Sequence, residues 1–128
     1  MSLRSPISRV TGLGTAKEGA GHWWSQRVTS VALLLLGMWF VASLLRMPTF
    51  SHEFVTTWIA MPLNAVLLLL LIGTLVYHSK LGVQVAVEDY VQPDGLKMVN
   101  LLLLTFAHVG LAALAVFAVL RIAFGGGA

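Results

Sequence analysis

Three long stretches of this chain carry no Asp, Glu, Lys or Arg, and this feature limits most strongly what the chain can fold into. They cover residues 28–45, 54–79 and 98–120, and Leu, Val and Ala dominate them. A charge-free apolar stretch of about 18 residues or more is long enough, as a helix, to cross the ~30 Å hydrocarbon core of a bilayer. Charges are costly at the bilayer centre, so gaps between charges indicate membrane spans.

The composition of the 128-residue chain supports this interpretation. Apolar residues make up 58% of it and charged residues only 10%, whereas soluble domains average about 25% charged. A soluble fold and a disordered chain are therefore excluded. The net charge is +3, but the eight Lys and Arg are scattered, so nucleic acid is not expected as a partner. The chain has no Cys and hence no disulfide, iron–sulfur or thiolate–zinc site of its own.

The sequence thus predicts an all-α integral membrane protein with three transmembrane helices. We expect an N-terminal cytoplasmic tail over residues 1–21 and a three-helix membrane domain over residues 22–128. The three helices are predicted at about 24–46, 58–91 and 96–124. Pro62 suits a first helical turn, and no helix breaker follows Lys80 until Pro93, where Pro93-Asp94-Gly95 predicts the turn into the third span.

The distribution of basic residues predicts the orientation. Lys and Arg are enriched in cytoplasmic loops beside membrane spans. With the N-terminus inside, six basic residues lie on the inner side and two on the outer. The inner residues are Arg4, Arg9, Lys17, Arg27, Lys80 and Lys97, and the outer ones are Arg46 and Arg121. Trp23, Trp24 and Trp58 stand near the ends of spans, where indole rings prefer the membrane interface.

His78 is the most informative polar residue, because it lies within a predicted span. Thr74 and Gly82 flank it on the same helix face, and their small side chains leave room for another helix or a flat ligand. Asp89 lies 11 residues further, about 20° away in projection. The residues alone leave three roles open for His78: a hydrogen bond to a neighbouring helix, axial ligation of haem iron, or a proton relay.

Two further groups near the inner boundary allow both a structural and a functional interpretation. Asp89 and Tyr90 form either a solvated helix end with an interfacial aromatic ring or a site for a polar head such as a quinone. Arg27 is either a positive-inside anchor or the partner of an anionic group such as a haem propionate or a lipid phosphate. His22 and Ser25 are close enough in sequence to share that role.

The remaining polar residues have simpler interpretations. His108, in the third span, is expected at a depth similar to that of His78. A metal clamped between the two histidines is one possibility, and a hydrogen bond between helices is the favoured one. Asn64, near the outer end of the second span, is expected to tie helices together. His52 and Glu53 are expected to be solvated in the outer loop.

Two motifs resemble a known family. His78 is followed after ten residues by Asp89-Tyr90, and the stretch GHWWSQRVTSV at residues 21–31 opens the first span. The H-x(10)-D-Y pattern resembles that of the small hydrophobic membrane-anchor chain of succinate dehydrogenase. The N-terminal stretch is similar to the one that opens the first helix of that family. Length, number of spans and predicted orientation agree, so the resemblance covers most of the chain.

The resemblance implies a role and a set of site residues. In this family the chain is a non-catalytic anchor of respiratory complex II, which passes electrons from succinate to ubiquinone in the tricarboxylic acid cycle and the respiratory chain. His78 would be one axial ligand of haem b, bound to the haem iron. Tyr90 would contact the quinone with support from Asp89, and Arg27 would lie near the haem propionates. The family pattern assigns no role to His108.

The resemblance also implies partners and a location. The partners are the flavoprotein subunit, the iron–sulfur subunit and the larger cytochrome b anchor subunit, which supplies the other haem ligand and completes a helix bundle within membrane lipid. The expected location is the bacterial inner membrane, as a multi-pass protein with a cytoplasmic N-terminus. Other interpretations are a fumarate reductase anchor, a free-standing cytochrome b, a small proton-pathway or transport protein using His78, Asp89 and His108, and a purely structural membrane protein.

Overall fold

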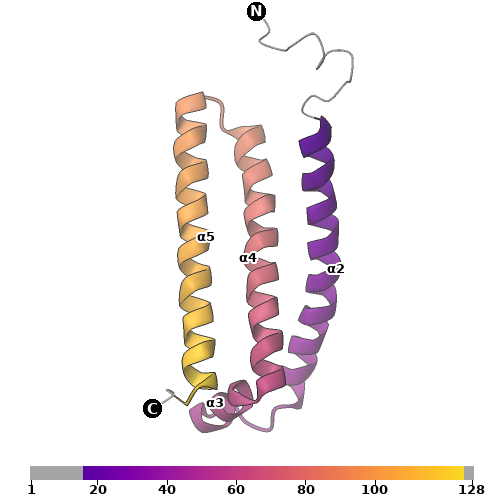
Figure 1. The fold of residues 1–128 in the computed structure, drawn as a ribbon, viewed down its shortest axis with the longest axis vertical. Coiled ribbons are helices and arrows are strands. Elements are labelled where there is room, and N and C mark those ends of the chain that lie inside the picture. The colour runs from indigo at the N-terminus through magenta and orange to yellow at the C-terminus, as the bar shows by residue number, and fades with distance from the viewer. Residues whose placement is uncertain (1–15, 126–128) are drawn as a thin grey trace, which may run out of the picture.

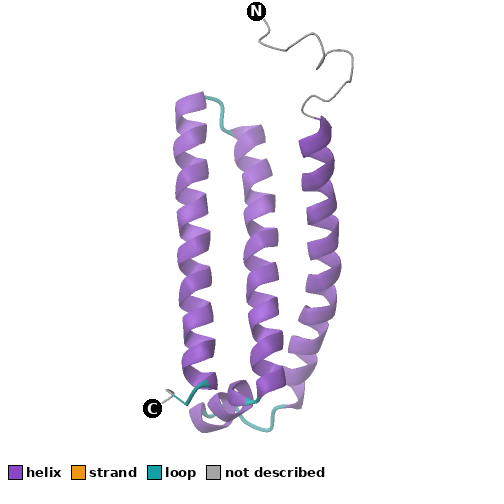
Figure 2. Cartoon of the chain, viewed as in Figure 1, coloured by secondary structure: helices purple, strands orange, loops and turns teal. Residues whose placement is uncertain are grey.

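The computed structural model describes residues 16–125, with side chains from residue 20 onward. This part of the chain contains four helices and no strand: α2 (Ala16–Arg46), α3 (His52–Ala60), α4 (Pro62–Tyr90) and α5 (Asp94–Ala123). The three long helices stand side by side with α4 between α2 and α5, and α3 closes one end (Figures 1 and 2). α2 from Ala20, α4 and α5 are each long and apolar enough to span a membrane, which confirms the predicted all-α class with three spans.

The first helix begins earlier than predicted. Residues 16–21, assigned to the tail from the sequence, are helical in the structure, and the rest of the predicted tail, residues 1–15, lies outside the described part. The reason is the stretch Ala16-Lys17-Glu18, three good helix formers with no proline behind them. The helix ends at Arg46 as predicted, shortly before Pro48, whose ring disfavours helical backbone at Met47.

The second predicted helix is divided in two. The sequence predicts one helix from about residue 58, but the structure ends α3 at Ala60 and starts α4 at Pro62. Met61 between them has φ −63° and ψ 126°, an extended conformation. A residue that precedes proline is pushed out of the helical region by the pyrrolidine ring, so Pro62 both breaks the helix and starts the next one.

The short helix α3 differs from the prediction, which places residues 52–60 in the outer loop and at the edge of the second span. Its N-cap is Ser51, whose hydroxyl accepts a hydrogen bond from the backbone N–H of Phe54 at 3.3 Å. Glu53 in the first turn suits the positive end of the helix dipole. His52 and Glu53 are exposed, as expected, although they are helical.

The connection between α4 and α5 is shorter than predicted. α4 continues without a break to Tyr90, and α5 starts at Asp94 with Pro93 as its N-cap. Asp94 and Gly95, expected in the turn, are therefore the first residues of α5. An Asp in the first helical turn is stabilised by the helix dipole, which explains why the helix extends back to this residue.

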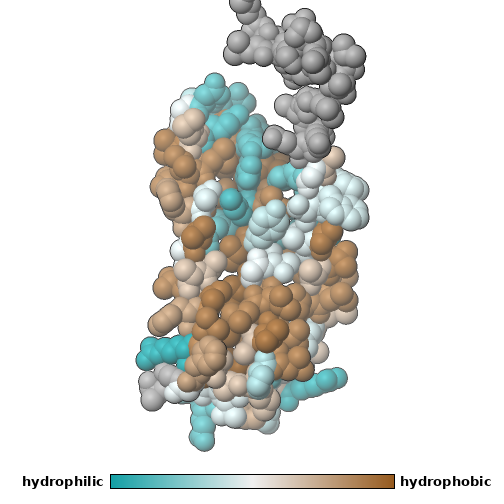
Figure 3. All heavy atoms as spheres, in the orientation of Figure 1, coloured by the Kyte–Doolittle hydropathy of each residue, from teal (hydrophilic) through white to brown (hydrophobic). Residues whose placement is uncertain are grey.

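Few side chains are buried in the described part of the chain, and the main cluster lies toward the α3 end. Ala65 and Leu68 of α4 pack there with Val119 of α5. Trp58 stacks on Trp39 with ring centroids 5.7 Å apart, so it is part of the packing at this end of the bundle. Hydrophobic residues cover the middle of the visible face and hydrophilic ones gather toward both ends (Figure 3). This apolar exterior requires lipid or other protein around it.

Candidate functional site

The interface between α2 and α4 contains a polar contact between two side chains. Thr29 Oγ1 of α2 lies 2.9 Å from His78 Nδ1 of α4, and both side chains are half-buried. Thr29 Oγ1 also donates to the backbone carbonyl of Ser25 at 2.7 Å. A hydrogen bond to a neighbouring helix, one of the three roles that the residues alone left open for His78, is therefore present.

This contact leaves the other imidazole nitrogen of His78 without a partner. Within the described residues, His78 Nε2 makes no hydrogen bond. A threonine hydroxyl has one proton, and the short bond to the Ser25 carbonyl uses it. Thr29 Oγ1 then accepts from Nδ1–H, and Nε2 carries the free lone pair. Neutral imidazole in this tautomer is the form that binds a metal ion.

Two more polar side chains lie on the same face of α2. His22 and Gln26 stand four residues apart, and Gln26 comes three residues before Thr29. His22 Nε2 and Gln26 Oε1 are buried and have no hydrogen-bond partner among residues 16–125. Gln26 Nε2 lies 3.8 Å from the position that a Cβ on Gly82 would occupy, so this side chain lies against α4 beside Gly82. Buried unpaired polar atoms are rare and indicate a group or water that completes them.

His108 has a different environment. Its Nδ1 lies 2.8 Å from the Leu104 carbonyl and its Nε2 lies 3.2 Å from Ser79 Oγ on α4. A carbonyl only accepts, so Nδ1 carries the proton and Nε2 accepts from the serine hydroxyl. The favoured prediction, a hydrogen bond between helices, is confirmed. Because Ser79 follows His78, the two histidines also lie at a similar depth, as predicted, but they face different partners.

Arg27 does not share the inward face. Its side chain is exposed, and the guanidinium carbon lies over the Trp23 ring at 5.3 Å from the centroid. Cation–π contact of this kind holds the guanidinium on the outer surface of α2. His22, which the sequence suggested only as a helper of Arg27, is the residue whose ring nitrogen Nε2 is buried.

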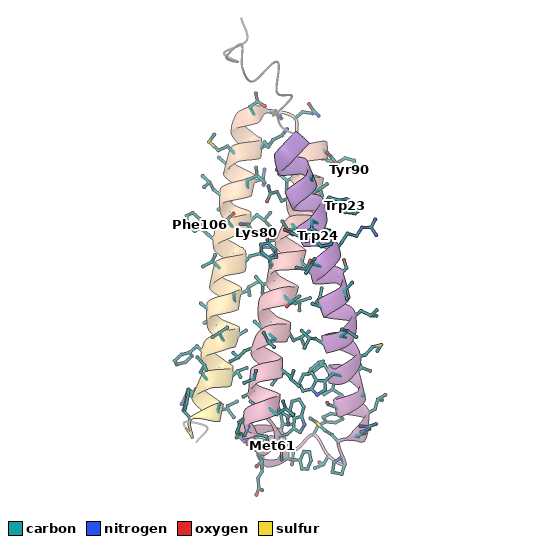
Figure 4. All side chains as sticks on the ribbon, turned by 45° about the vertical axis from the view of Figure 1, so that its right-hand side comes forward. Trp23, Trp24, Met61, Lys80, Tyr90 and Phe106 are labelled. Atoms are coloured by element: carbon teal, nitrogen blue, oxygen red, sulfur yellow. The ribbon has the colours of Figure 1, made fainter. Side chains whose placement is uncertain are left out.

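Asp89 and Tyr90 lie at the end of α4, distant from His78. Both are exposed, Tyr90 to 85%, and neither makes a hydrogen bond or ion pair with the described residues. Figure 4 shows Tyr90 projecting outward at the same end as Trp23 and Trp24. Twelve residues of helix separate Tyr90 from His78, about 18 Å along the axis. The structure therefore contains two separate candidate sites on α4 and not one.

Comparison with known proteins identifies the family. A family model described as the succinate dehydrogenase/fumarate reductase transmembrane subunit matches residues 1–120. This match covers nearly the whole chain. The chain belongs to this family.

Relatives specify which subunit the chain resembles. It is 32% identical over 95 residues to the succinate dehydrogenase hydrophobic membrane anchor subunit of Rickettsia bellii, covering 74% of this chain and 76% of that protein. It is 29% identical over 125 residues to the subunit of the same name from Paracoccus denitrificans, covering 98% and 96%. The chain is a membrane anchor subunit of succinate dehydrogenase, as the two sequence motifs predicted.

Two residues of the anchor subunit's α2–α4 interface were not identified from the sequence. Thr29 and Gln26 have no metal-ligand or catalytic pattern around them, and Thr29 lies 49 positions from His78. The one signal for them was their spacing from His22 on one helix face. It could not be used without knowing which face of α2 packs on α4. Within the described residues no group of three or more His, Asp or Glu forms a metal site.

Proposed function

We propose that this anchor subunit contributes His78 to haem b and Tyr90, supported by Asp89, to a ubiquinone site, within a complex that passes electrons from succinate to ubiquinone. Haem b supplies one-electron redox chemistry when bound. The observation that carries the proposal is the state of the His78 imidazole. Its Nδ1 is held by Thr29 while its Nε2 stays free of hydrogen bonds within the described residues.

A single histidine supports a shared haem. His108 uses both of its ring nitrogens for Leu104 and Ser79, so it is a poor second ligand. The second axial ligand is therefore proposed to come from the larger cytochrome b anchor subunit. The buried Nε2 of His22 is suited to donate to a haem propionate. Arg27, exposed beside Trp23, is proposed to reach a propionate only by leaving that ring.

The quinone part of the proposal concerns the end of α4. The Tyr90 hydroxyl and the Asp89 carboxylate project from the helix with no partner among the described residues. A phenol can donate a hydrogen bond to a quinone carbonyl oxygen, and a nearby carboxylate can orient the phenol or relay protons taken up from water during reduction. Reduction of a quinone consumes two protons, which favours a site near water over one at the bilayer centre.

The exposed surface supports the proposed partners. Gly37 lies on an open, shallow apolar surface of α2 among Leu33, Leu34, Met38 and Val41. A glycine lets another helix approach closely in a membrane, so this surface is proposed to receive a helix of the larger anchor subunit. The flavoprotein and iron–sulfur subunits are proposed to lie at the Tyr90 end, on the cytoplasmic side of the bacterial inner membrane, with the N-terminus on that side.

The geometry does not favour the alternative of a proton pathway through His78, Asp89 and His108. No hydrogen bond in the described part of the chain links His108 to His78: His108 bonds Ser79 and the Leu104 carbonyl, and His78 bonds Thr29. Asp89 lies 11 residues from His78, about 16 Å along the helix axis, which is too far for direct proton transfer.

Two matched variants test the haem proposal. In the assembled complex, His78→Leu should abolish or strongly perturb the reduced-minus-oxidised b-type spectrum, because it removes the free Nε2. His108→Leu is the control, since it deletes an imidazole at the same depth that is already satisfied. It should leave the spectrum nearly unchanged. The proposal is wrong if the two variants exchange these phenotypes.

Co-purification of a flavoprotein and an iron–sulfur protein with the tagged wild-type chain tests the proposed partners.

A further inference from the structure

We infer that Thr29 is a positioning residue for the His78 imidazole, setting its tautomer and ring orientation and thereby lowering the reduction potential of the bound haem. The inference rests on the proposed function of His78 and adds a residue to it. It starts from one contact, the 2.9 Å approach of Thr29 Oγ1 to His78 Nδ1.

The direction of the hydrogen bonds determines what Thr29 can do. Its hydroxyl lies 2.7 Å from the Ser25 carbonyl and 3.2 Å from the Gln26 carbonyl, and a carbonyl can only accept. With the hydroxyl proton directed to these carbonyls, the oxygen lone pairs face His78. The resulting chain runs from Nδ1–H to the hydroxyl and on to the backbone of α2.

Thr29 is also held rigidly enough to orient a ring. A β-branched side chain has few rotamers in a helix, and the bond to the Ser25 carbonyl selects one of them. The contact is half-buried between α2 and α4, where a hydrogen bond is stronger than in water. Thr74, one turn before His78 on its own helix, makes no such bond to the imidazole in the described structure.

The electronic effect has a definite sign. A hydrogen bond accepted from Nδ1–H moves electron density toward Nε2 and makes the imidazole a stronger donor to iron. A stronger donor stabilises ferric iron more than ferrous iron, so the reduction potential is lower with the hydrogen bond than without it. Loss of the Thr29 hydroxyl should therefore raise the potential.

Three variants of the assembled complex test the inference by redox titration of the haem. Thr29→Val keeps the shape and removes the hydroxyl, and Thr29→Ser keeps the hydroxyl. Thr105→Val is the matched control, because Thr105 bonds only the Leu101 carbonyl of its own helix. Removing a group that is hydrogen-bonded to a metal-bound histidine typically changes metal affinity by about 10–100-fold. A tenfold loss in ferric over ferrous binding corresponds to a rise of about 59 mV for a one-electron couple.

The expected result is a raised potential in Thr29→Val and potentials near wild type in Thr29→Ser and Thr105→Val. The inference is wrong if Thr29→Val has the same haem potential as the Thr105→Val control while the haem still depends on His78. That outcome leaves the haem proposal intact. Haem that persists in His78→Leu overturns the haem proposal itself. If Thr29→Val fails to assemble, Thr29→Ala replaces it, since it only deletes atoms, and the same comparison with Thr29→Ser decides.

Discussion

At the residue scale, two consecutive residues of α4 make hydrogen bonds to the helices on either side of it, at the same depth along the bundle. His78 contacts Thr29 of α2, and Ser79 contacts His108 of α5. Polar groups in an apolar environment are costly unless they are hydrogen-bonded, so such pairs stabilise one register of the three helices. The two imidazoles differ in one respect. His108 is satisfied at both nitrogens, and His78 retains one nitrogen for a ligand.

The proposed role of Tyr90 can be tested by removing a single oxygen atom. Tyr90→Phe removes only the phenolic hydroxyl from an exposed ring, so the fold should persist. Loss of one donor in a strongly preorganised site costs about 10²–10³-fold in rate, and an exposed, wetter site should lose less. We expect clearly reduced succinate–quinone activity. Electron transfer from succinate to a soluble artificial acceptor and the haem content should stay normal, because His78 is about 18 Å away.

The control for this prediction is Tyr77→Phe, which removes the same hydroxyl from the other tyrosine of the chain, one residue before His78. It should retain quinone reductase activity. Near-normal activity in a fully assembled Tyr90→Phe complex would remove Tyr90 from the site, leaving an aromatic residue of the membrane interface.

At the element scale, one side chain joins α3 to α4. Asn64 Nδ2 donates to the Trp58 carbonyl at 2.9 Å, across the break that Pro62 imposes. This carbonyl belongs to the last turn of α3, where helical carbonyls lack intrahelical donors. The sequence analysis placed Trp58 and Asn64 in one helix, so this local bond is not the tie to another span that was expected for Asn64; it explains how a nine-residue helix is held at the end of the bundle.

We predict that Asn64→Leu loosens α3 without disturbing α4. A hydrogen bond of this type contributes about 1 kcal/mol, which corresponds to roughly fivefold faster amide exchange when an opening of that size governs it. Hydrogen–deuterium exchange of peptides over residues 52–60 in the intact complex measures this. Asn100→Leu is the control, because Asn100 bonds only the Leu96 carbonyl of its own helix. Unchanged exchange in α3 would show that the Asn64 bond has no stabilising role.

At the scale of the whole molecule, charged residues bound an apolar layer about as thick as a membrane. The charge-free part of α2 from Arg27 to Arg46 is about 28 Å long, and that of α4 from Pro62 to Lys80 is about 27 Å. Both match the hydrocarbon core of a bilayer. Because Thr29 faces His78, Arg27 and Lys80 lie at nearly the same level. The last turns of α4, with Tyr90, then project about 15 Å beyond it.

The orientation of this layer is a prediction that reporter fusions can test. Six basic residues on the N-terminal side against two on the other favour that side as cytoplasmic. A reporter fused after Thr49 should therefore report the outer side of the membrane, and one fused after Asp94 should report the cytoplasm. The reverse pattern would invert the proposed orientation and place Tyr90 on the outer side.

The class of fold, the number of spans, most helix ends and the family follow from the order of residues along the chain. Gaps between charges locate the spans, and Pro62 and Pro93 locate helix starts. The spacing of His78 to Asp89-Tyr90 carries the family resemblance. The existence of α3 is also encoded locally, by the Ser51 cap and the proline after Met61, two signals that the predicted helix boundaries left out.

Which side chains meet depends instead on how the helices pack. A hydropathy pattern that is apolar all round a helix does not reveal which face lies against its neighbour. The pairing of Thr29 with His78, of Ser79 with His108 and of Trp39 with Trp58 depends on the rotation and relative depth of separate helices. The same rotation turned His22 inward and Arg27 outward. The chemistry of His78 depends on this packing, because one hydroxyl from another helix determines which of its nitrogens is free.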